Sequence, residues 1–269
     1  MVRLALIGCG AIGSTIAQMV EDIPEVEAIY LYDRSRRLKN HLARSLKKGR
    51  VLNDIEEIIE RSDLVIEAAS QQAVKEYVPM ALEKGKSVVI MSVGALVDPV
   101  FRRRIERLAK ARHRKIYIPS GAVAGIDGVS AGSAARVERA TLVTIKHPNA
   151  FRNNQYVVDR KIDLDGIKKA TVIYEGTAED AVVHFPQNIN VAATLSLAGV
   201  GFKKTRVRII ADPAATRNIH KILLKGDFGV LETEVRNVPS PQNPRTSYLA
   251  ALSAVSAIRK IVGTVWIGA

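Results

Sequence analysis

VRLALIGCGAIGSTIAQMV, residues 2–20, decides the fold of the first part of this chain. It starts as an apolar run, passes through GCGAIG at 8–13 and continues in a helical pattern, so we predict a strand, a tight turn and a helix. Gly8 would permit the turn, Gly10 would let the backbone approach a pyrophosphate, and Gly13 would let the helix pack on the strand. This spacing predicts a dinucleotide-binding turn.

An acidic residue supports that interpretation. A second apolar run, 26–32, ends at Asp33, twenty residues after Gly13, where a carboxylate can accept hydrogen bonds from the adenosine ribose hydroxyls. The phosphates would then bind the N–H groups of Ala11, Ile12 and Gly13 at the start of the helix. The alternative is a glycine turn that serves packing only.

The composition indicates an intracellular protein rather than a membrane or secreted one. A chain of 269 residues with 47% hydrophobic residues can bury a substantial core, in one large or two modest domains. Its apolar runs are far shorter than the roughly 20 residues that cross a bilayer. Cys9 is the single cysteine, which excludes an intrachain disulfide and a multi-cysteine metal site. We expect a cytoplasmic protein without a metal.

The net charge of +13 is spread evenly along the chain. Residues 1–120 hold 21 basic and 15 acidic side chains, and the remainder holds 19 and 12. A basic arm or an aromatic-interleaved basic strand is missing from this pattern, so we expect no nucleic-acid partner. A positive surface would instead attract an anionic metabolite.

The first part of the chain alternates short apolar runs with helical segments, which is the pattern of a parallel sheet covered on both faces. With the glycine turn after the first strand, the predicted strand order is 3-2-1-4-5-6, and ligands bind at the carboxyl ends of the strands. The loops 68–71 and 92–95 at that edge are candidate cofactor contacts. The expected strands are 2–7, 26–32, 50–52, 64–67, 87–91 and 115–118, and the expected helices include 11–20, 71–84 and 99–111.

Small residues at 119–128 mark a domain boundary, after which polar-alternating strands predict an open mixed sheet with one covered face. The fold class is therefore α/β: a doubly wound Rossmann domain at 1–119, an α+β catalytic and dimerisation domain at 120–246, and a helix at 247–269 that returns to the first domain. An open sheet leaves a face to cover, so we expect a homodimer. Strands are expected at 141–146, 170–174, 205–210 and 230–238, and helices at 178–183, 189–200 and 247–262.

Candidate chemistry lies in the second domain. Asn188 and Asn190 precede an apolar helix, where one asparagine can cap the helix and Asn190 can face a carboxamide such as that of nicotinamide. His220 follows a polar turn at 212–213, and a neutral imidazole there could accept a proton. The alternative is a structural histidine. The other four histidines lie in charged helix or loop contexts, which is typical of the surface.

The stretch 238–247 is braced by prolines and leads into the last helix. Arg245, Thr246 and Ser247 could hold a carboxylate, with Arg245 able to bind one through two hydrogen bonds. An equally good interpretation is a linker in which a serine or threonine caps the helix.

Together these motifs resemble the L-aspartate dehydrogenase family over the whole length of the chain. The resemblance implies that His220 is the active-site residue and that Ala124 and Asn190 contact the cofactor. The motifs that carry it are GxGxxG at 8–13, PSGAxAG at 119–125, FPxNxNVA at 185–192, ADP at 211–213, NIH at 218–220 and PSPxNPxTS at 239–247.

The resemblance also implies an activity. L-Aspartate would be oxidised to iminosuccinate, which water converts to oxaloacetate and ammonia, without a metal, and the imine would pass to quinolinate synthesis for NAD production. Asp33 favours NAD, whereas Arg34, Arg36 and Arg37 could meet the 2′-phosphate of NADP, so either cofactor is compatible with the sequence.

Two other classes of function remain alternatives. One is a different two-domain dehydrogenase, of the homoserine dehydrogenase or dihydrodipicolinate reductase type, against which the histidine and asparagine motifs argue. The other is a non-catalytic NAD-binding redox regulator, for which we would expect a helix-turn-helix or a basic arm. We expect small-molecule partners, aspartate or oxaloacetate and ammonia, and no membrane.

Overall fold

A computed structural model describes residues 1–185, 189–240 and 243–268, with the backbone alone described at 189 and 243–245. Its contacts divide the chain into two compact units. Unit 1 comprises Met1–Gly121 and Ala250–Ile267, and unit 2 comprises Ala122–Leu249. Among the described residues, no helix has the length and apolar character that a membrane crossing needs.

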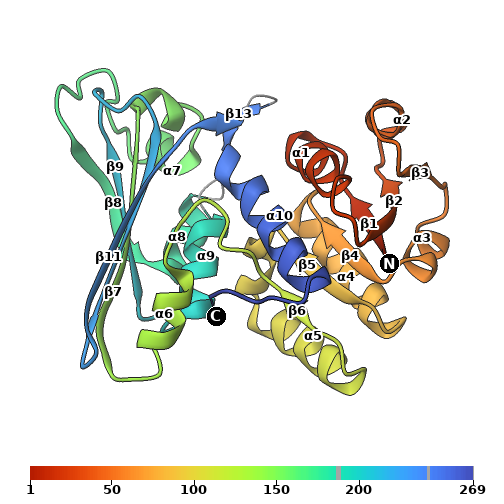
Figure 1. Ribbon diagram of the computed structural model, residues 1–269. Helices are drawn as coiled ribbons and strands as arrows, with labels where there is room; N and C mark the ends of the chain where they lie inside the picture. Colours follow the sequence, from red (N-terminus) through yellow and green to blue (C-terminus); the bar gives the residue numbers. More distant parts are fainter. Residues whose placement is uncertain (186–188, 241–242, 269) are drawn as a thin grey trace. The chain divides into compact units, whose positions relative to one another are not determined.

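Unit 1 is built on a six-stranded parallel sheet in the order β3-β2-β1-β4-β5-β6, which confirms the predicted doubly wound order (Figure 1). The central strands read as continuous apolar runs because both faces of the sheet are covered. The strands are β1 Val2–Ile7, β2 Val26–Tyr32, β3 Gly49–Val51, β4 Leu64–Glu67, β5 Ser87–Ile90 and β6 Ile116–Tyr117.

Side chains that accept a hydrogen bond from the first turn begin most helices of unit 1. Ser35, Asp54, Ser70 and Asp98 cap the second to fifth α-helices in this way, whereas the first helix begins at Gly10 without a side-chain cap from any described residue. The helices are α1 Ala11–Val20, α2 Arg36–Arg44, α3 Ile55–Arg61, α4 Gln71–Glu83, the short 3₁₀ helix η1 Val93–Val97 and α5 Pro99–Ala111.

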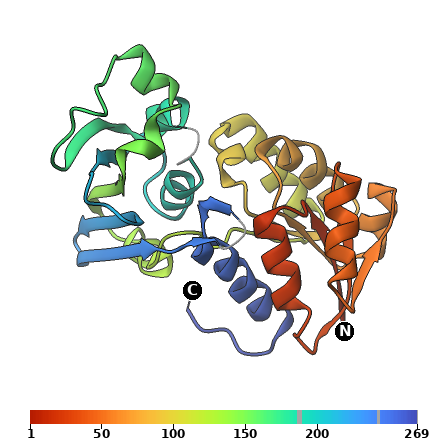
Figure 2. The same cartoon turned by 90° about the horizontal axis from the view of Figure 1, so that it is seen from above.

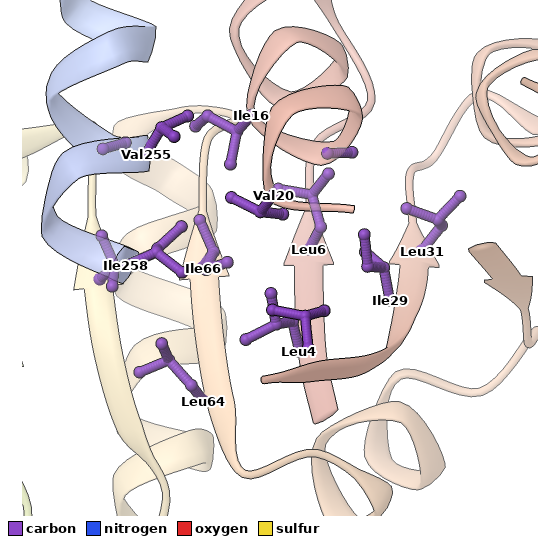
Figure 3. Close-up of a cluster of buried hydrophobic side chains, with 14 of the residues drawn as sticks. Leu4, Leu6, Ile16, Val20, Ile29, Leu31, Leu64, Ile66, Val255 and Ile258 are labelled. Atoms are coloured by element: carbon purple, nitrogen blue, oxygen red, sulfur yellow. The ribbon is translucent and has the colours of Figure 1, made fainter. Parts of the chain in front are cut away.

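The core of unit 1 includes residues from the far end of the chain. Helix α10, Tyr248–Val262, places Val255 and Ile258 against the sheet next to Ile16 and Val20 of α1 (Figure 3). Both views show α10 beside α1 (Figures 1 and 2), and the amide of Gly121 donates to Ser253 Oγ. The last helix is therefore part of the dinucleotide-type unit and completes the cover of one sheet face.

Unit 2 is built on a five-stranded mixed sheet in the order β11-β10-β7-β9-β8. Strands β7 and β9 are parallel and the other neighbours are antiparallel, which confirms an open mixed sheet. Strand β10 was not among the expected strands, and it contains His220. A small two-stranded sheet joins the last two strands. The strands are β7 Val137–Lys146, β8 Thr171–Thr177, β9 Thr205–Ala211, β10 Asn218–Gly226, β11 Gly229–Asn237, β12 Pro239–Ser240 and β13 Asn243–Ser247.

The helices of unit 2 cover the inner face of this sheet, on which Leu142, Val207 and Ile222 are buried. Helix α6 begins directly within the small-residue stretch of the expected boundary, at Ile126, after Gly125 in a left-handed conformation. The helices are α6 Ile126–Gly132, the 3₁₀ helix η2 Pro148–Phe151, α7 Gln155–Asp159, α8 Ala178–His184 and α9 Ile189–Ala198.

Candidate functional site

The glycine turn after β1 has the geometry of a phosphate-binding turn. Gly8 has φ of +102°, and a Cβ added there would lie 2.6 Å from the carbonyl oxygen of Ala68. A Cβ on Gly13 would overlap the carbonyl oxygen of Gly8, so α1 packs directly on the turn. A Cβ on Gly10 would meet no described atom within 4 Å, which leaves the backbone there open to a ligand.

The start of α1 offers backbone donors at this opening. The first hydrogen bond within the helix runs from the amide of Ser14 to the carbonyl of Gly10, at 2.8 Å. The amides of Ala11, Ile12 and Gly13 precede it and by helix geometry have no acceptor inside the helix. Backbone donors together with the positive end of the helix dipole form an anion site that fits a diphosphate.

Asp33 ties this turn to the end of β2. Its carboxylate accepts hydrogen bonds from the amides of Cys9, at 2.8 Å, and Ser35, at 2.7 Å. The same carboxylate faces a pocket of about 120 Å³ whose wall includes Gly8, Ser70 and Tyr77. Asp33 therefore holds the turn and lines the pocket next to it.

The arginines after Asp33 have different surroundings. Arg34 lines the same pocket and forms an ion pair with Glu76, with 2.8 Å between Nη2 and Oε2. Arg36 and Arg37 are exposed at the start of α2. Of the three basic side chains considered for a 2′-phosphate, Arg34 is the one that lines the pocket with Asp33.

Glu67, at the end of β4, joins the two loops that the sequence proposed as cofactor contacts. It is fully buried, and its carboxylate accepts from the amides of Ala69 and Ser70, at 2.8 and 2.9 Å, and from the amide and hydroxyl of Ser92, at 3.0 and 2.8 Å. Burial raises the pKa of this carboxyl, and the four hydrogen bonds oppose that rise. The sequence analysis missed Glu67, although an acidic residue that ends the apolar run 64–67 was a usable signal.

His220 lies on the inner face of the sheet in unit 2. It pairs with Thr144 of β7 on one side and Val235 of β11 on the other, and its Nδ1 is 3.0 Å from Thr144 Oγ1. The side chain is 4% exposed. Burial, together with the positive charge of Lys146, lowers the pKa of the imidazole to about 3, so the ring is neutral at physiological pH.

The segment that contains Ala124 crosses the same face. Asn237 donates through Nδ2 to the carbonyl of Ala122, and Thr233 donates through Oγ1 to the carbonyl of Ala124, both at 3.1 Å. Val235 lies between these two contacts along β11 and is the partner of His220. The structure therefore brings Ala124 and His220 to one face of the sheet.

Several elements end where His220 lies. Lys146 ends β7 and pairs with Ala211, which ends β9, and Asn237 ends β11. We call this edge of the sheet, next to His220, the site end. Residues 199–204 join the C-terminal end of α9 to the start of β9, and the helix packs along that strand. The N-terminal end of α9, with the exposed Asn190, therefore points toward the site end.

The remaining predicted residues have mixed outcomes. Asn188 lies outside the described residues, and so does the side chain of Arg245. Thr246 and Ser247 belong to β13, where Ser247 pairs with Pro239 just beyond β11. This hairpin continues the chain from the site end. Within 1–185, 189–240 and 243–268, no group of three histidine, cysteine or acidic side chains is arranged to hold a metal ion.

Two residues next to His220 were missed by the sequence analysis, Thr144 and Lys146. Both are buried on the inner face of β7, and burial lowers the pKa of Lys146 to about 8. The signal that could have found them is the alternation along 141–146, which places Leu142, Thr144 and Lys146 on one side.

Comparison with known proteins gives the family. Residues 127–261 match the family model "Aspartate dehydrogenase, C-terminal", and residues 8–119 match "Homoserine dehydrogenase, NAD binding domain". The chain is 48% identical to L-aspartate dehydrogenase of Methanosarcina barkeri, with 100% of both chains covered. It is 40% identical to the enzyme of that name from Nitrosopumilus maritimus, with 97% of this chain and 96% of the relative covered.

Solved structures agree with this assignment. The crystal structure of aspartate dehydrogenase from Thermotoga maritima matches with a TM-score of 0.80 and 30% identity over 100% of both chains. An amine dehydrogenase from Mycobacterium smegmatis, at 14% identity and a TM-score of 0.59, shares the fold. With full-length relatives at 40% identity and above, and a family model over its second half, this chain belongs to the L-aspartate dehydrogenase family.

Proposed function

We propose that this chain oxidises L-aspartate with a nicotinamide dinucleotide to iminosuccinate, which water converts to oxaloacetate and ammonia. The observation that carries the proposal is the buried, neutral imidazole of His220, in contact with Thr144 at the site end. A base is needed because the ammonium of aspartate must lose a proton before Cα can give up hydride. The family membership supplies the substrate class.

The residues present fit the cofactor. The open backbone at Gly10, the donors at the start of α1 and the carboxylate of Asp33 suit a diphosphate and an adenosine ribose. When bound, the nicotinamide supplies the hydride acceptor, and the protein supplies orientation and proton transfer. We assign Ala124 and Asn190 to the nicotinamide end, supported by the position of Ala124 on the face of His220 and of Asn190 toward the site end.

We assign the proton transfer to Nε2 of His220, because Nδ1 is in contact with Thr144. A neutral ring can accept a proton from the substrate ammonium or from the water that attacks the imine. Its pKa of about 3 makes it a weak base in the absence of substrate. The negative charge of a bound dicarboxylate would raise that pKa toward the range in which a general base is effective.

We propose NAD as the preferred cofactor, with NADP as a weaker substitute. Asp33 lines the pocket and would repel a 2′-phosphate while it accepts hydrogen bonds from free ribose hydroxyls. Arg34 is the counter-argument, but its guanidinium already pairs with Glu76.

We propose that Thr246 and Ser247 contribute donors to the substrate, together with Asn188 and Arg245, on the strength of their sequence positions. The support from geometry is that β13 lies just beyond the site end.

The test of the proposed activity is NADH formation by the purified protein with a panel of substrates. The panel contains L-aspartate, D-aspartate, L-asparagine, L-glutamate and L-homoserine, and the products are identified as oxaloacetate and ammonia. L-Aspartate should give the highest kcat/KM. A preference for homoserine would contradict the proposal and would favour the activity named in the match over residues 8–119.

We also propose that the enzyme is a homodimer that uses the outer face of the sheet in unit 2. Half-buried apolar side chains lie on that face, beside the ion-paired Lys221 and Arg208: Val143, Ile145, Ile210, Ile219 and Leu223. In Figure 1, α8 and α9 lie on the opposite side of this sheet. Light scattering at micromolar concentration should give twice the chain mass, and a monomeric mass for the wild type would contradict the proposal.

A further inference from the structure

Lys146 is a buried lysine on the face of the sheet that carries His220. Along β7 the inward residues Ala140, Leu142, Thr144 and Lys146 are all buried, and Lys146 is 9% exposed. Its carbonyl accepts from the amide of Asp212 at 2.9 Å. The strand pairing and this hydrogen bond therefore fix the backbone position of Lys146.

The spacing to His220 suits a small substrate. Thr144 touches the imidazole, and Lys146 is the next residue on the same face of β7, about 7 Å farther along the strand. Burial lowers the pKa of the imidazole most, and the charge of Lys146 lowers it further. The two groups therefore belong to one local environment, with a cation at one end and a neutral base at the other.

That pair complements an amino acid that carries carboxylates. An ammonium buried this deeply is costly, because burial disfavours the charged form. The pKa of Lys146 is lowered to about 8, so it is still mainly protonated at neutral pH. A protonated lysine on the face of the sheet that carries His220 attracts a carboxylate, and aspartate has two carboxylates.

We propose that Lys146 binds one of the two carboxylates of the substrate and so positions the amine toward His220. This inference rests on the proposed function and assigns a substrate contact that the sequence motifs did not contain. Lys146 shares a sheet face with His220, whereas Arg245, Thr246 and Ser247 were proposed from sequence position.

The test uses Lys146→Met, which keeps the apolar length of the side chain, and Lys146→Arg, which keeps the charge. The matched control is Lys86→Met. Burial lowers the pKa of Lys86 as well. Lys86 directly precedes β5, at the edge of the sheet opposite the glycine turn, and donates to the carbonyls of Glu60 and Ser62. Thermal unfolding of each variant establishes that the fold is intact.

The first readout is equilibrium binding of succinate by calorimetry, because succinate has both carboxylates and no amine to oxidise. Lys146→Met should weaken succinate by about 30-fold or more, the effect of removing one partner of a buried charge pair, and Lys146→Arg should recover part of that loss. Affinity for NAD should stay within about 3-fold in all variants. Lys86→Met should bind succinate like the wild type.

The second readout identifies the carboxylate. L-2-Aminobutyrate lacks the side-chain carboxylate, and β-alanine lacks the α-carboxylate. Lys146→Met should therefore lower the binding affinity least for the compound that lacks the carboxylate bound by Lys146. Unchanged succinate affinity in Lys146→Met, or an equal loss in Lys86→Met, would overturn the inference. If the wild type oxidises aspartate but Lys146→Met binds succinate with unchanged affinity, the proposed function stands and this inference fails. If the wild type does not oxidise aspartate, the proposed function fails, whatever the succinate result.

Discussion

Thr144 Oγ1 lies 3.0 Å from His220 Nδ1, across the pairing of β7 with β10. This contact fixes the plane of the imidazole and selects which nitrogen faces away from the strand. Thr144→Val should lower kcat about 10-fold through loss of one buried hydrogen bond, with little change in NAD affinity. Thr144→Ser, which keeps the hydroxyl, is the control. Equal kcat values for the valine and serine variants would show that the contact is irrelevant to turnover.

His220→Ala should lower the rate of aspartate oxidation by roughly 10²- to 10⁴-fold, the usual contribution of a positioned acid or base. NAD affinity should stay within a few-fold, because the glycine turn and Asp33 belong to unit 1. His41→Ala, at an exposed site in α2, is the matched control. Steady-state kinetics and calorimetry separate the two effects, and a near-normal rate in His220→Ala would make this histidine structural.

The first unit could be predicted almost residue by residue because its signals are local. Buried parallel strands are apolar runs, and Gly8 and Gly13 mark the turn between β1 and α1. The predicted strands 2–7, 26–32 and 64–67 match the structure to the residue.

Two features of the second unit, strand β10 and the burial of Lys146, could not be predicted from local sequence patterns. Strand β10 was missed because it follows directly on a polar turn and places Lys221 and Lys225 on its outer face, so it reads as a charged loop. Lys146 was missed because a lysine at the end of a strand usually reaches solvent. Its burial depends on tertiary packing over the inner face of the sheet, and single-sequence patterns do not contain those contacts.

Acid should destabilise the wild type more than a variant without the imidazole. The pKa of His220 is about 3 in the fold against 6.5 for an ordinary histidine, so below pH 6.5 the unfolded chain binds a proton that the folded chain does not. Stability is fully present above pH 6.5 and is lost as the pH falls toward 3, by a few kcal/mol in total. Urea unfolding at pH 7 and pH 4.5 should therefore give a larger drop for the wild type than for His220→Gln. Identical drops would mean that this histidine titrates normally.

Asp33→Ala should weaken NAD more than NADP, with a shift in preference of roughly 1 to 3 kcal/mol. Because Asp33 also accepts from the amides of Cys9 and Ser35, both cofactors should lose some affinity, and the ratio of the two dissociation constants is the informative quantity. Arg34→Ala serves as the opposite control and should weaken NADP at least as much as NAD. Equal losses for both cofactors in Asp33→Ala would contradict the assignment of this carboxylate to the ribose.

Glu67→Gln should weaken NAD although Glu67 itself is fully buried under the two loops. The carboxylate accepts four hydrogen bonds from residues 69, 70 and 92, and an amide would turn an NH₂ group toward donors, leaving at least one buried donor unpaired at about 1 to 3 kcal/mol. Part of that cost should be relieved by movement of the loops, so we expect about a 10-fold rise in the Kd of NAD together with a lower unfolding temperature.

Glu83→Gln, at the exposed end of α4, is the control and should change neither the Kd of NAD nor the unfolding temperature. Calorimetric titration of NAD, made well below the unfolding temperature of the variant, decides the matter. A destabilised Glu67→Gln protein with wild-type NAD affinity would mean that the loops at 68–71 and 92–95 can shift without affecting the cofactor, and would remove them from the binding site.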